Sequence, residues 1–238
     1  MDKVTVIIPT YNRFMYLLNT IDSIKKQSYP NVEIIVVNDC STQEEYYQHD
    51  FGSSVKIIHL PENTKRKFGF ASAGHVRNEG IRNASGKYIA FCDDDDIWFP
   101  DKLANQLNAM ARTGCKMSCT EGIIGEGAYD SNKKYQKYNS EHFFIILKDI
   151  YRRNYNDALK NGFPDIWDLK FVSIHNCIIC SSVIIEKALL YKINGMLCVP
   201  NGQEDYNCWL TALQHTDCVY VNDVCFYYDA GHGYGQNY

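Results

Sequence analysis

The chain has 238 residues, of which 45% are hydrophobic and 22% are charged, and its formal net charge is −4. This length and balance predict one globular domain with a large core and exclude a disordered class. The negative charge argues against a nucleic-acid surface, because contact with the phosphate backbone requires a basic face. No stretch approaches the roughly 18 apolar residues of a membrane span, and no signal peptide precedes the first strand pattern. The sequence therefore predicts a soluble, intracellular protein of the cytoplasm without a transmembrane segment.

The first hundred residues alternate predicted strands and helices. Apolar runs predict strands at 4–8, 32–37, 55–60 and 87–92. Apolar residues at helical spacing predict helices at 14–24 and 73–84 and a further helix from residue 100. Such alternation predicts an α/β fold, with a Rossmann-like, mainly parallel sheet and helices on both faces.

The second half has a weaker pattern. Residues 113–172 are rich in aromatic side chains, which suits a substrate-facing subregion better than a second domain. A strand running into a short helix is predicted at 177–187, and a helix opened by an acidic pair at 204–213. Glycines at 231, 233 and 235 predict a flexible tail over 226–238.

The ten cysteines lie mostly inside apolar runs, such as the one at 224–226. In a chain without a secretion signal this placement predicts reduced thiols in the core. The alternative is a zinc site that combines Cys115 and Cys119 with the cysteines of the 177–180 CxxC spacing. Hydrophobic strand residues flank that spacing, whereas zinc ligands usually sit in turns.

Four successive aspartates, at 93–96, directly follow the predicted strand at 87–92. Crowded carboxylates at the end of a buried strand repel one another, so they need protonation, hydrogen-bond donors or a cation. An oxygen-only ligand set favours a hard ion such as Mg²⁺ or Mn²⁺, which commonly also binds the phosphates of a substrate. The alternative is a polar loop in which two of the aspartates cap the helix that begins near residue 100.

Thr10, Asp39 and the 93–96 aspartates each follow a predicted strand. Ligands of parallel α/β sheets bind beyond the carboxyl ends of the strands. We therefore expect these residues, which are far apart in the sequence, to share one crevice.

Five motifs carry a resemblance to a known family. They are Val-Ile-Ile-Pro-Thr-Tyr-Asn-Arg at 6–13, Val-Val-Asn-Asp-Cys-Ser at 36–41, Arg-Asn-Glu-Gly-Ile at 77–81 with Ala-Ser-Gly-Lys-Tyr-Ile at 84–89, the aspartates at 93–96, and Glu-Asp at 204–205. In this order they resemble a family 2 glycosyltransferase of the GT-A fold, closely in the N-terminal half and sparsely in the C-terminal half. The resemblance implies that a sugar moves from a nucleotide diphosphate donor to an acceptor with inversion at the anomeric carbon.

The same resemblance implies one domain over 1–238. It divides into a nucleotide-sugar-binding half at 1–112, an acceptor-binding half at 113–225 and the tail at 226–238. The expected partners are a nucleotide-sugar donor, with a UDP-sugar favoured, and a glycan or other hydroxyl acceptor. The nucleotide-binding segment comprises Pro9, Thr10, Tyr11, Asn12 and Arg13.

Within the donor site, the resemblance implies that Thr10 and Tyr11 line the base pocket and that the tyrosine ring faces the pyrimidine. Asp39 resembles the carboxylate that accepts the uracil N3–H, and its alternative role is a helix or turn cap. Arg77 would neutralise the diphosphate. Lys65 or Arg66 would assist it, with plain solvated charge as the alternative for these two residues.

For the metal, the aspartates resemble a DxD-type motif whose ends are Asp93 and Asp95. Asp95 is the first choice as ligand of Mn²⁺ or Mg²⁺, and Asp93 and Asp94 would contact the ribose or metal-bound water. Asp96 is expected to cap the next helix. His232 resembles a late histidine that lies near the metal or diphosphate in some relatives, and its alternative is a tail residue without a special role.

Asp205 is the candidate general base, because inverting transfer needs a carboxylate that takes the proton of the acceptor hydroxyl. An acidic pair that opens a helix also favours the helix dipole without any catalytic role. Two other functions are the alternatives to a transferase: a sugar nucleotidyltransferase, although the chain lacks the expected Gly-rich basic loop after its first strand, and a donor-binding module without turnover.

Overall fold

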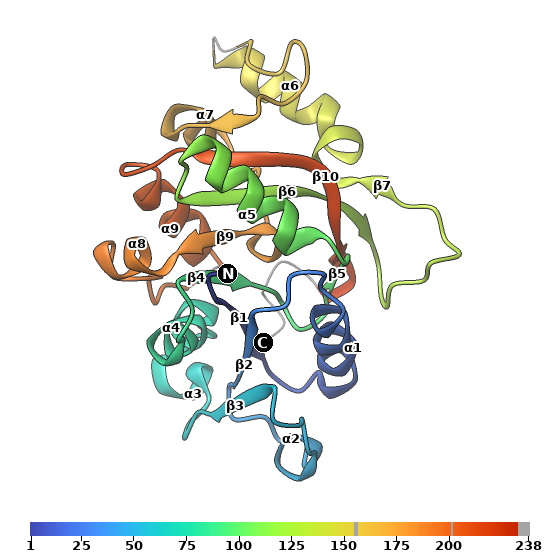
Figure 1. The fold of residues 1–238 in the computed structure, drawn as a ribbon, viewed down its shortest axis with the longest axis vertical. Helices are drawn as coiled ribbons and strands as arrows, with labels where there is room; N and C mark the ends of the chain where they lie inside the picture. The colour runs from blue at the N-terminus through green and yellow to red at the C-terminus, as the bar shows by residue number, and fades with distance from the viewer. Residues whose placement is uncertain (155–156, 201, 233–238) are drawn as a thin grey trace.

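The computed structural model of the protein describes residues 1–154, 157–200 and 202–232, and these form one ten-stranded sheet. The sheet order is β3-β2-β1-β4-β9-β6-β10-β5, with β7 paired to β6 and β8 to β10 (Figure 1). The strands are β1 (Val4–Thr10), β2 (Val32–Asn38), β3 (Val55–His59), β4 (Tyr88–Phe91), β5 (Ile97–Trp98), β6 (Met117–Gly125), β7 (Gln136–Lys137), β8 (Ile166–Trp167), β9 (Ile184–Glu186) and β10 (Cys218–Asp229).

The four strands predicted in the N-terminal half are confirmed as a parallel block. β1 pairs with β2 on one side and with β4 on the other, and β2 pairs with β3, all in parallel. The carboxyl ends of these strands therefore lie along one edge of the sheet. β9 runs antiparallel between β4 and β6, and β6 and β10 are parallel to each other. The prediction of a mainly parallel sheet is thus confirmed.

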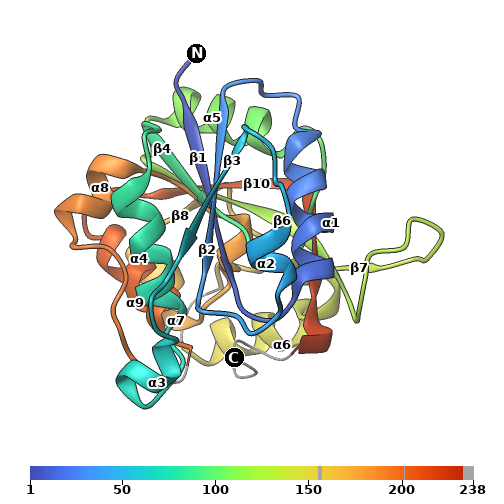
Figure 2. The ribbon, with the colours of Figure 1, turned by 90° about the horizontal axis from the view of Figure 1, so that it is seen from below.

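Helices cover both faces of the sheet, as predicted. The α-helices are α1 (Phe14–Lys25), α2 (Glu45–Gln48), α3 (Thr64–Phe68), α4 (Ala73–Asn83), α5 (Lys102–Thr113), α6 (Phe144–Arg153), α7 (Leu169–Ile174), α8 (Lys187–Lys192) and α9 (Glu204–Ala212). Figure 2 shows α1 and α4 on opposite sides of β1 and β2. Alternation along β1 explains this arrangement, because Ile7 packs into the core beside α4 while Val6 and Ile8 pack beside α1.

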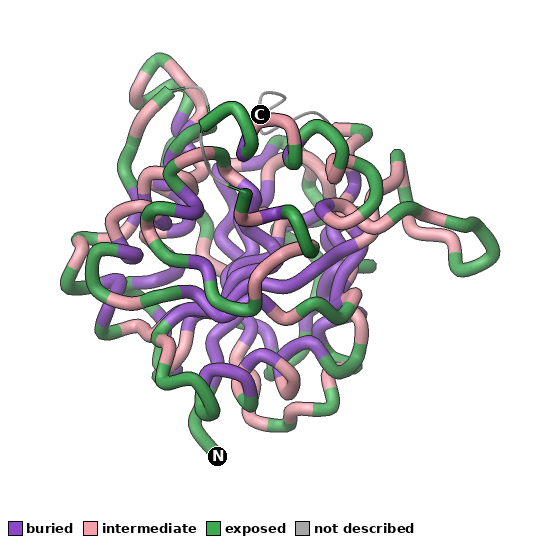
Figure 3. The backbone as a smooth tube through the Cα atoms, turned by 90° about the horizontal axis from the view of Figure 1, so that it is seen from above, coloured by how far each residue is buried: buried purple, intermediate pink, exposed green. Residues whose placement is uncertain are grey.

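The second half of the chain contributes more to the core than its composition indicated. Tyr151 and Trp167, two of the aromatic residues in the 113–172 segment, are fully buried. Buried backbone follows the centre of the molecule and exposed loops surround it (Figure 3). Residues 226–229 continue β10 and do not belong to a flexible tail. Gly233 and Gly235 lie outside the described residues.

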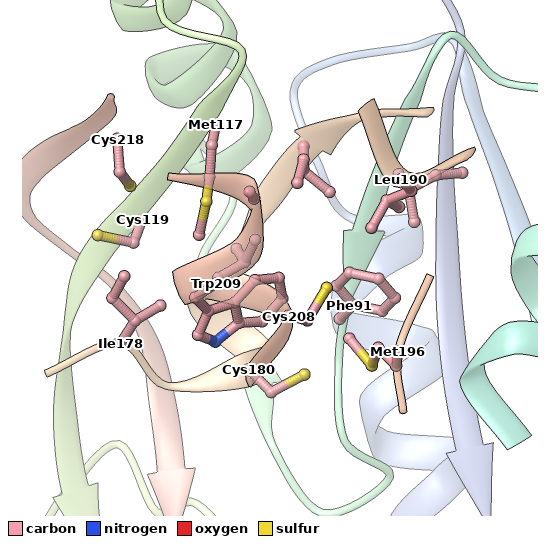
Figure 4. Close-up of a cluster of buried hydrophobic side chains, with 14 of the residues drawn as sticks. Phe91, Met117, Cys119, Ile178, Cys180, Leu190, Met196, Cys208, Trp209 and Cys218 are labelled. Carbon is pink, nitrogen blue, oxygen red and sulfur yellow. The ribbon is translucent and has the colours of Figure 1, made fainter. Parts of the chain in front are cut away.

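A hydrophobic cluster fixes α9 against the sheet. Trp209 is fully buried, and its ring centroid lies 5.9 Å from that of Phe91 at the end of β4. Cys180 and Cys208 lie beside the indole ring (Figure 4). Because Trp209 stands one helical turn after Asp205, this packing also sets the position of the acidic pair that opens α9.

All ten cysteines are free thiols, and seven of them are buried. Within the described ranges, no three His, Cys, Asp or Glu side chains are grouped as a complete metal site, so the zinc alternative has no ligand cluster there. None of the helices in the described ranges is both long and apolar enough to cross a membrane.

Candidate active site

The four aspartates form the turn between β4 and β5, at the edge where the parallel strands end. The Asp96 amide donates to the Asp93 carbonyl (3.2 Å), which closes the turn. The Asp93 amide donates to Ser181 Oγ (2.9 Å), which ties the turn to the segment before β9. Burial of the turn leaves Asp94 and Asp96 almost inaccessible, while Asp93 keeps 28% of its side chain exposed. We refer to residues 93–96 as the aspartate turn.

Arg13 bridges the two central carboxylates of the aspartate turn. Its Nη1 lies 2.8 Å from Asp95 Oδ2 and 3.2 Å from Asp94 Oδ1. Burial raises the pKa of Asp94 to about 6 and also raises the pKa of Asp95 well above its ordinary value, and in both cases the Arg13 charge opposes the rise. A positive charge nearby therefore stabilises the ionised form of these carboxylates, as their crowding predicted.

Asp95, Asp229 and His232 converge beside Arg13. His232 Nδ1 lies 3.2 Å from Asp95 Oδ2 and 3.2 Å from Asp229 Oδ2. Asp229 is held in place because its Oδ1 accepts hydrogen bonds from the amides of Gly127 (2.7 Å) and Gly231 (2.8 Å). The structure thus places His232 against Asp95 and Asp229.

Arg77 connects the aspartate turn to the acidic pair of α9. Its Nη2 donates to Asp93 Oδ1 (2.5 Å) and its Nη1 to Glu204 Oε1 (2.9 Å). The arginine side chain is only 6% exposed. A guanidinium held in this way supplies positive charge to one wall of the site.

Asp205 lies next to this bridge at the N-terminus of α9. Burial raises the pKa of its carboxyl to about 7, an effect that Arg77 opposes and Glu204 reinforces. A carboxyl that titrates near neutral pH is suited to accept a proton during a reaction.

One cleft joins these groups. Its charged lining comes from Arg13, Arg77, Asp93, Asp94, Asp95, Glu204, Asp205 and Asp229. Its less polar wall comes from Tyr138, from Tyr228 and from the segment 176–180. Carboxylates, two guanidinium groups and aromatic rings therefore face one space.

Several predicted donor residues are placed differently. The Thr10 side chain is fully buried, and its Oγ1 donates to Asp94 Oδ2 (2.6 Å), so it supports the aspartate turn and does not line a base pocket. Asn12 adopts a positive φ of 53°, and its Oδ1 accepts from the Thr42 amide (2.8 Å). It joins two loops and does not cap α1, whose N-cap residue is Arg13. Pro9 is buried within β1.

Asp39 is fully buried and is engaged by the start of α3. Its Oδ1 accepts from the Thr64 amide (2.8 Å), and its Oδ2 accepts from Thr64 Oγ1 (2.6 Å) and Asn63 Nδ2 (3.1 Å). This geometry favours the capping alternative over contact with uracil. Lys65 and Arg66 are exposed on α3, away from the cleft lining, which favours solvated charge, and Tyr11 is half-buried in the loop after β1.

The expectation that Asp96 caps the following helix is wrong. Its Oδ1 accepts from the Asp229 amide (2.9 Å), and α5 starts only at Lys102. The physical reason is that the short strand β5 intervenes and pairs with β10, which brings the Asp229 backbone onto Asp96.

Sequence reasoning did not identify Asp229 or Tyr138 as site residues. Asp229 lies three residues before His232, in the same motif, so this spacing was the available signal. Tyr138 follows an irregular segment whose aromatic residues look alike in sequence. Its role depends on a fold that brings it beside Tyr228, with ring centroids 5.6 Å apart.

The donor set fits an open site for Mn²⁺ or Mg²⁺. Such ions take one or two protein carboxylates and complete their shell with water and substrate phosphates, so a closed cluster of three protein ligands is not required. Asp95 and Asp229 offer carboxylate oxygens and His232 offers an imidazole nitrogen, and each of these oxygens lies 3.2 Å from His232 Nδ1.

Comparison with known proteins gives the family. A model described as glycosyl transferase family 2 matches residues 5–189. A Bacillus subtilis protein provisionally named TuaG, a teichuronic acid biosynthesis glycosyltransferase, is 29% identical over 231 residues, which are 93% of this chain and 76% of TuaG. WfaP of Escherichia coli, named a UDP-Glc:alpha-D-GlcNAc-diphosphoundecaprenol beta-1,3-glucosyltransferase, is 28% identical over 90% of this chain and 71% of its own. Other relatives are longer, since the chain spans 62% of a Rickettsia prowazekii glycosyltransferase and 18% of a Rickettsia bellii one.

Solved structures show the same fold. Staphylococcus aureus TarS in complex with UDP-GlcNAc gives a TM-score of 0.69 at 20% identity, over 97% of this chain and 59% of the TarS chain. The mannosyltransferase PcManGT from Pyrobaculum calidifontis, in complex with GDP-Man and Mn²⁺, gives 0.63 at 19% identity, over 94% of this chain and 56% of its own. With the family model covering most of its length, the chain belongs to glycosyl transferase family 2 and is a glycosyltransferase of the GT-A fold.

Proposed function

We propose that the protein transfers a sugar from a UDP-sugar to an acceptor hydroxyl, with inversion, in the cleft between the aspartate turn and α9. The observation that supports this proposal is that Arg13, Arg77, Asp95 and Asp205 line one cleft. TarS with UDP-GlcNAc and WfaP, whose name includes a UDP-Glc donor, support the choice of a UDP-sugar.

Asp205 acts as the general base in this proposal. The acceptor oxygen attacks the anomeric carbon from the side opposite the leaving group, Asp205 takes the hydroxyl proton, and UDP leaves with the bonding electron pair. The pKa of about 7 means that the carboxyl is substantially ionised at neutral pH and still basic enough to hold the proton. Its half-buried position excludes part of the competing water.

Arg13 and Arg77 stabilise the charge that develops on the departing diphosphate. Both line the cleft, and both already contact carboxylates, so each can shift its hydrogen bonds toward phosphate oxygens without leaving the site. Asp95 with Asp93, Asp229 or His232 would hold Mn²⁺ or Mg²⁺, which when bound supplies Lewis-acid stabilisation of the diphosphate.

The decisive experiment is product analysis of the purified protein with a panel of UDP-sugars, Mn²⁺ and a mixture of hydroxyl acceptors. The proposal expects UDP to be released together with a glycosylated product. In a parallel sample with added pyrophosphate, formation of UTP and a sugar 1-phosphate would instead identify a nucleotidyltransferase. UDP-sugar binding without any release of UDP would identify a binding module.

A further inference from the structure

A second cavity adjoins the cleft on the side away from the aspartate turn. It is lined by Tyr138, Asn139, Phe143, Leu147, His175 and Asn176, and it shares Tyr138 and Asn176 with the cleft. The Tyr138 ring stands between the two spaces, with its centroid 4.9 Å from that of Phe143 on one side and 5.6 Å from that of Tyr228 on the other. We refer to this second cavity as the side pocket.

The wall between the cleft and the side pocket is rigidly held. Residues Tyr138–His142 form a single π-helical turn, a feature that is frequent at functional sites. The fully buried Glu121 accepts hydrogen bonds from the amides of Asn139 (3.0 Å) and Ser140 (2.9 Å) and from Tyr220 Oη (3.0 Å). Because a buried carboxylate fixes the turn, the rings beside it are positioned before any ligand arrives.

Asn139, one of the residues that line the side pocket, also carries an unused polar acceptor. Asn139 is 3% exposed, and its Nδ2 donates to the Cys177 carbonyl (3.1 Å). Its Oδ1 is buried and accepts no hydrogen bond from any residue in the described ranges. Buried polar atoms almost always have a partner, so this oxygen can take a donor from a ligand in the side pocket once the amide turns toward it.

We infer that the side pocket binds a second sugar ring of the acceptor, the one that adjoins the sugar with the reacting hydroxyl. This inference rests on the proposed transferase function and narrows the acceptor to a saccharide of at least two rings. A pyranose ring has apolar C–H faces to lie against Tyr138 and Phe143, and it has hydroxyl groups to donate to Asn139 Oδ1. A hydrocarbon chain would fill the space beside Phe143 and Leu147 but would leave that oxygen without a donor.

The test is a comparison of binding constants that needs no turnover. Cellobiose, maltose, lactose and N,N′-diacetylchitobiose are titrated by ligand-observed NMR into the protein with UDP and Mg²⁺, each beside its component monosaccharides and beside octyl glucoside. At least one disaccharide should bind about tenfold or more tightly than its monosaccharides. Phe143→Ala and Asn139→Ala should remove that gain. Ser173→Ala, an exposed change two residues before His175, is the matched control and should retain it.

Equal affinities of disaccharides and monosaccharides in the wild type would overturn the inference. An unchanged gain in disaccharide affinity in both Phe143→Ala and Asn139→Ala would also overturn it. Octyl glucoside binding as tightly as the best disaccharide would overturn it in favour of an apolar occupant. Circular dichroism verifies that Asn139→Ala folds. His175→Ala is a further variant, at an exposed residue of the side pocket, and it should also reduce the gain in affinity of the disaccharide over its monosaccharides. UDP affinity in the same samples reports on the proposed function separately, because the side-pocket variants should leave it unchanged.

Discussion

Arg77 Nη1 lies 2.9 Å from Glu204 Oε1, and this buried bond joins α4 to α9. The two side chains are 6% and 9% exposed. Since Asp205 is the next residue, the bond also fixes the candidate base relative to the aspartate turn, which Arg77 contacts through Asp93.

Glu204→Gln should therefore destabilise the protein. The substitution removes a charged acceptor from a buried guanidinium, and we expect the free energy of unfolding to fall by about 1 to 3 kcal/mol. Urea denaturation followed by circular dichroism measures the change. Asp149→Asn is the matched control, because it breaks an exposed pair with Arg152 and should leave stability almost unchanged. Equal losses in the two variants would contradict the structural role of the Arg77 bridge.

Asp205→Asn should separate chemistry from donor binding. A general base contacts the acceptor hydroxyl in the transition state and makes little contact with the nucleotide, so transfer should fall by roughly 10²- to 10⁴-fold while UDP affinity persists. Calorimetry with UDP and a turnover assay on the same preparation measure both quantities. Asp217→Asn, on an exposed loop, is the control. Near-normal transfer by Asp205→Asn would move the role of base to Glu204.

The pH dependence of transfer should report the same carboxyl. Burial favours the protonated form of Asp205 and raises its pKa to about 7. Only the ionised form accepts a proton, so kcat/KM should rise as the pH increases through about 7 and should fall below it. Rate profiles between pH 5 and 9 in wild type and Asp205→Asn test this expectation. Retention of the same acidic limb in the variant would assign it to another group.

Removal of divalent metal should abolish donor binding. The aspartate turn repels a diphosphate unless a cation neutralises it, so EDTA should lower UDP affinity by about tenfold or more and Mn²⁺ should restore it. Asp95→Asn should damage both donor binding and transfer, unlike Asp205→Asn. Asp130→Asn, on the loop between β6 and β7, should damage neither. A UDP affinity that is the same in EDTA and in Mn²⁺ would exclude a metal role in donor binding.

Asp39→Ala should act on stability. The substitution removes the bonds by which Asp39 holds Thr64 and Asn63 at the start of α3, and we expect the free energy of unfolding to fall by about 0.5 to 2 kcal/mol. The ratio of UDP to CDP affinity should not change, because that ratio reports whether a residue reads the N3–H of uracil. A ratio that collapses toward one in the variant would restore Asp39 as a base-reading residue.

Much of the N-terminal half could be predicted from the sequence because its information is local. Apolar runs and helical spacing identify β1, α1 and α4, and the parallel arrangement brings the aspartate turn to the edge where α9 also begins. The direction in which each side chain points is harder to predict from the sequence. Thr10 ends β1 and Asp39 follows β2, yet each side chain is buried through hydrogen bonds to a residue far away in sequence, Asp94 and Thr64 respectively.

The C-terminal half was harder to predict for a related reason. β8 and β9 are two and three residues long, and strands this short carry little periodicity. Glycines near the end suggested a flexible tail, whereas Phe226 and Tyr227 pair with Trp98 and Ile97 of β5 and are fully buried. Such pairing depends on contacts between distant residues, which no local pattern records.

The position of β10 has a consequence for synthesis of the chain. β6 lies between β9 and β10, and β5 joins the sheet through β10, so both strands expose unpaired edges until residues 218–229 leave the ribosome. Open edges template association with other chains, so pairing with β10 removes two sites at which this chain could associate with another. The same strand ends at Asp229, beside Asp95. Protection of the sheet edges and completion of the cleft therefore depend on the same strand.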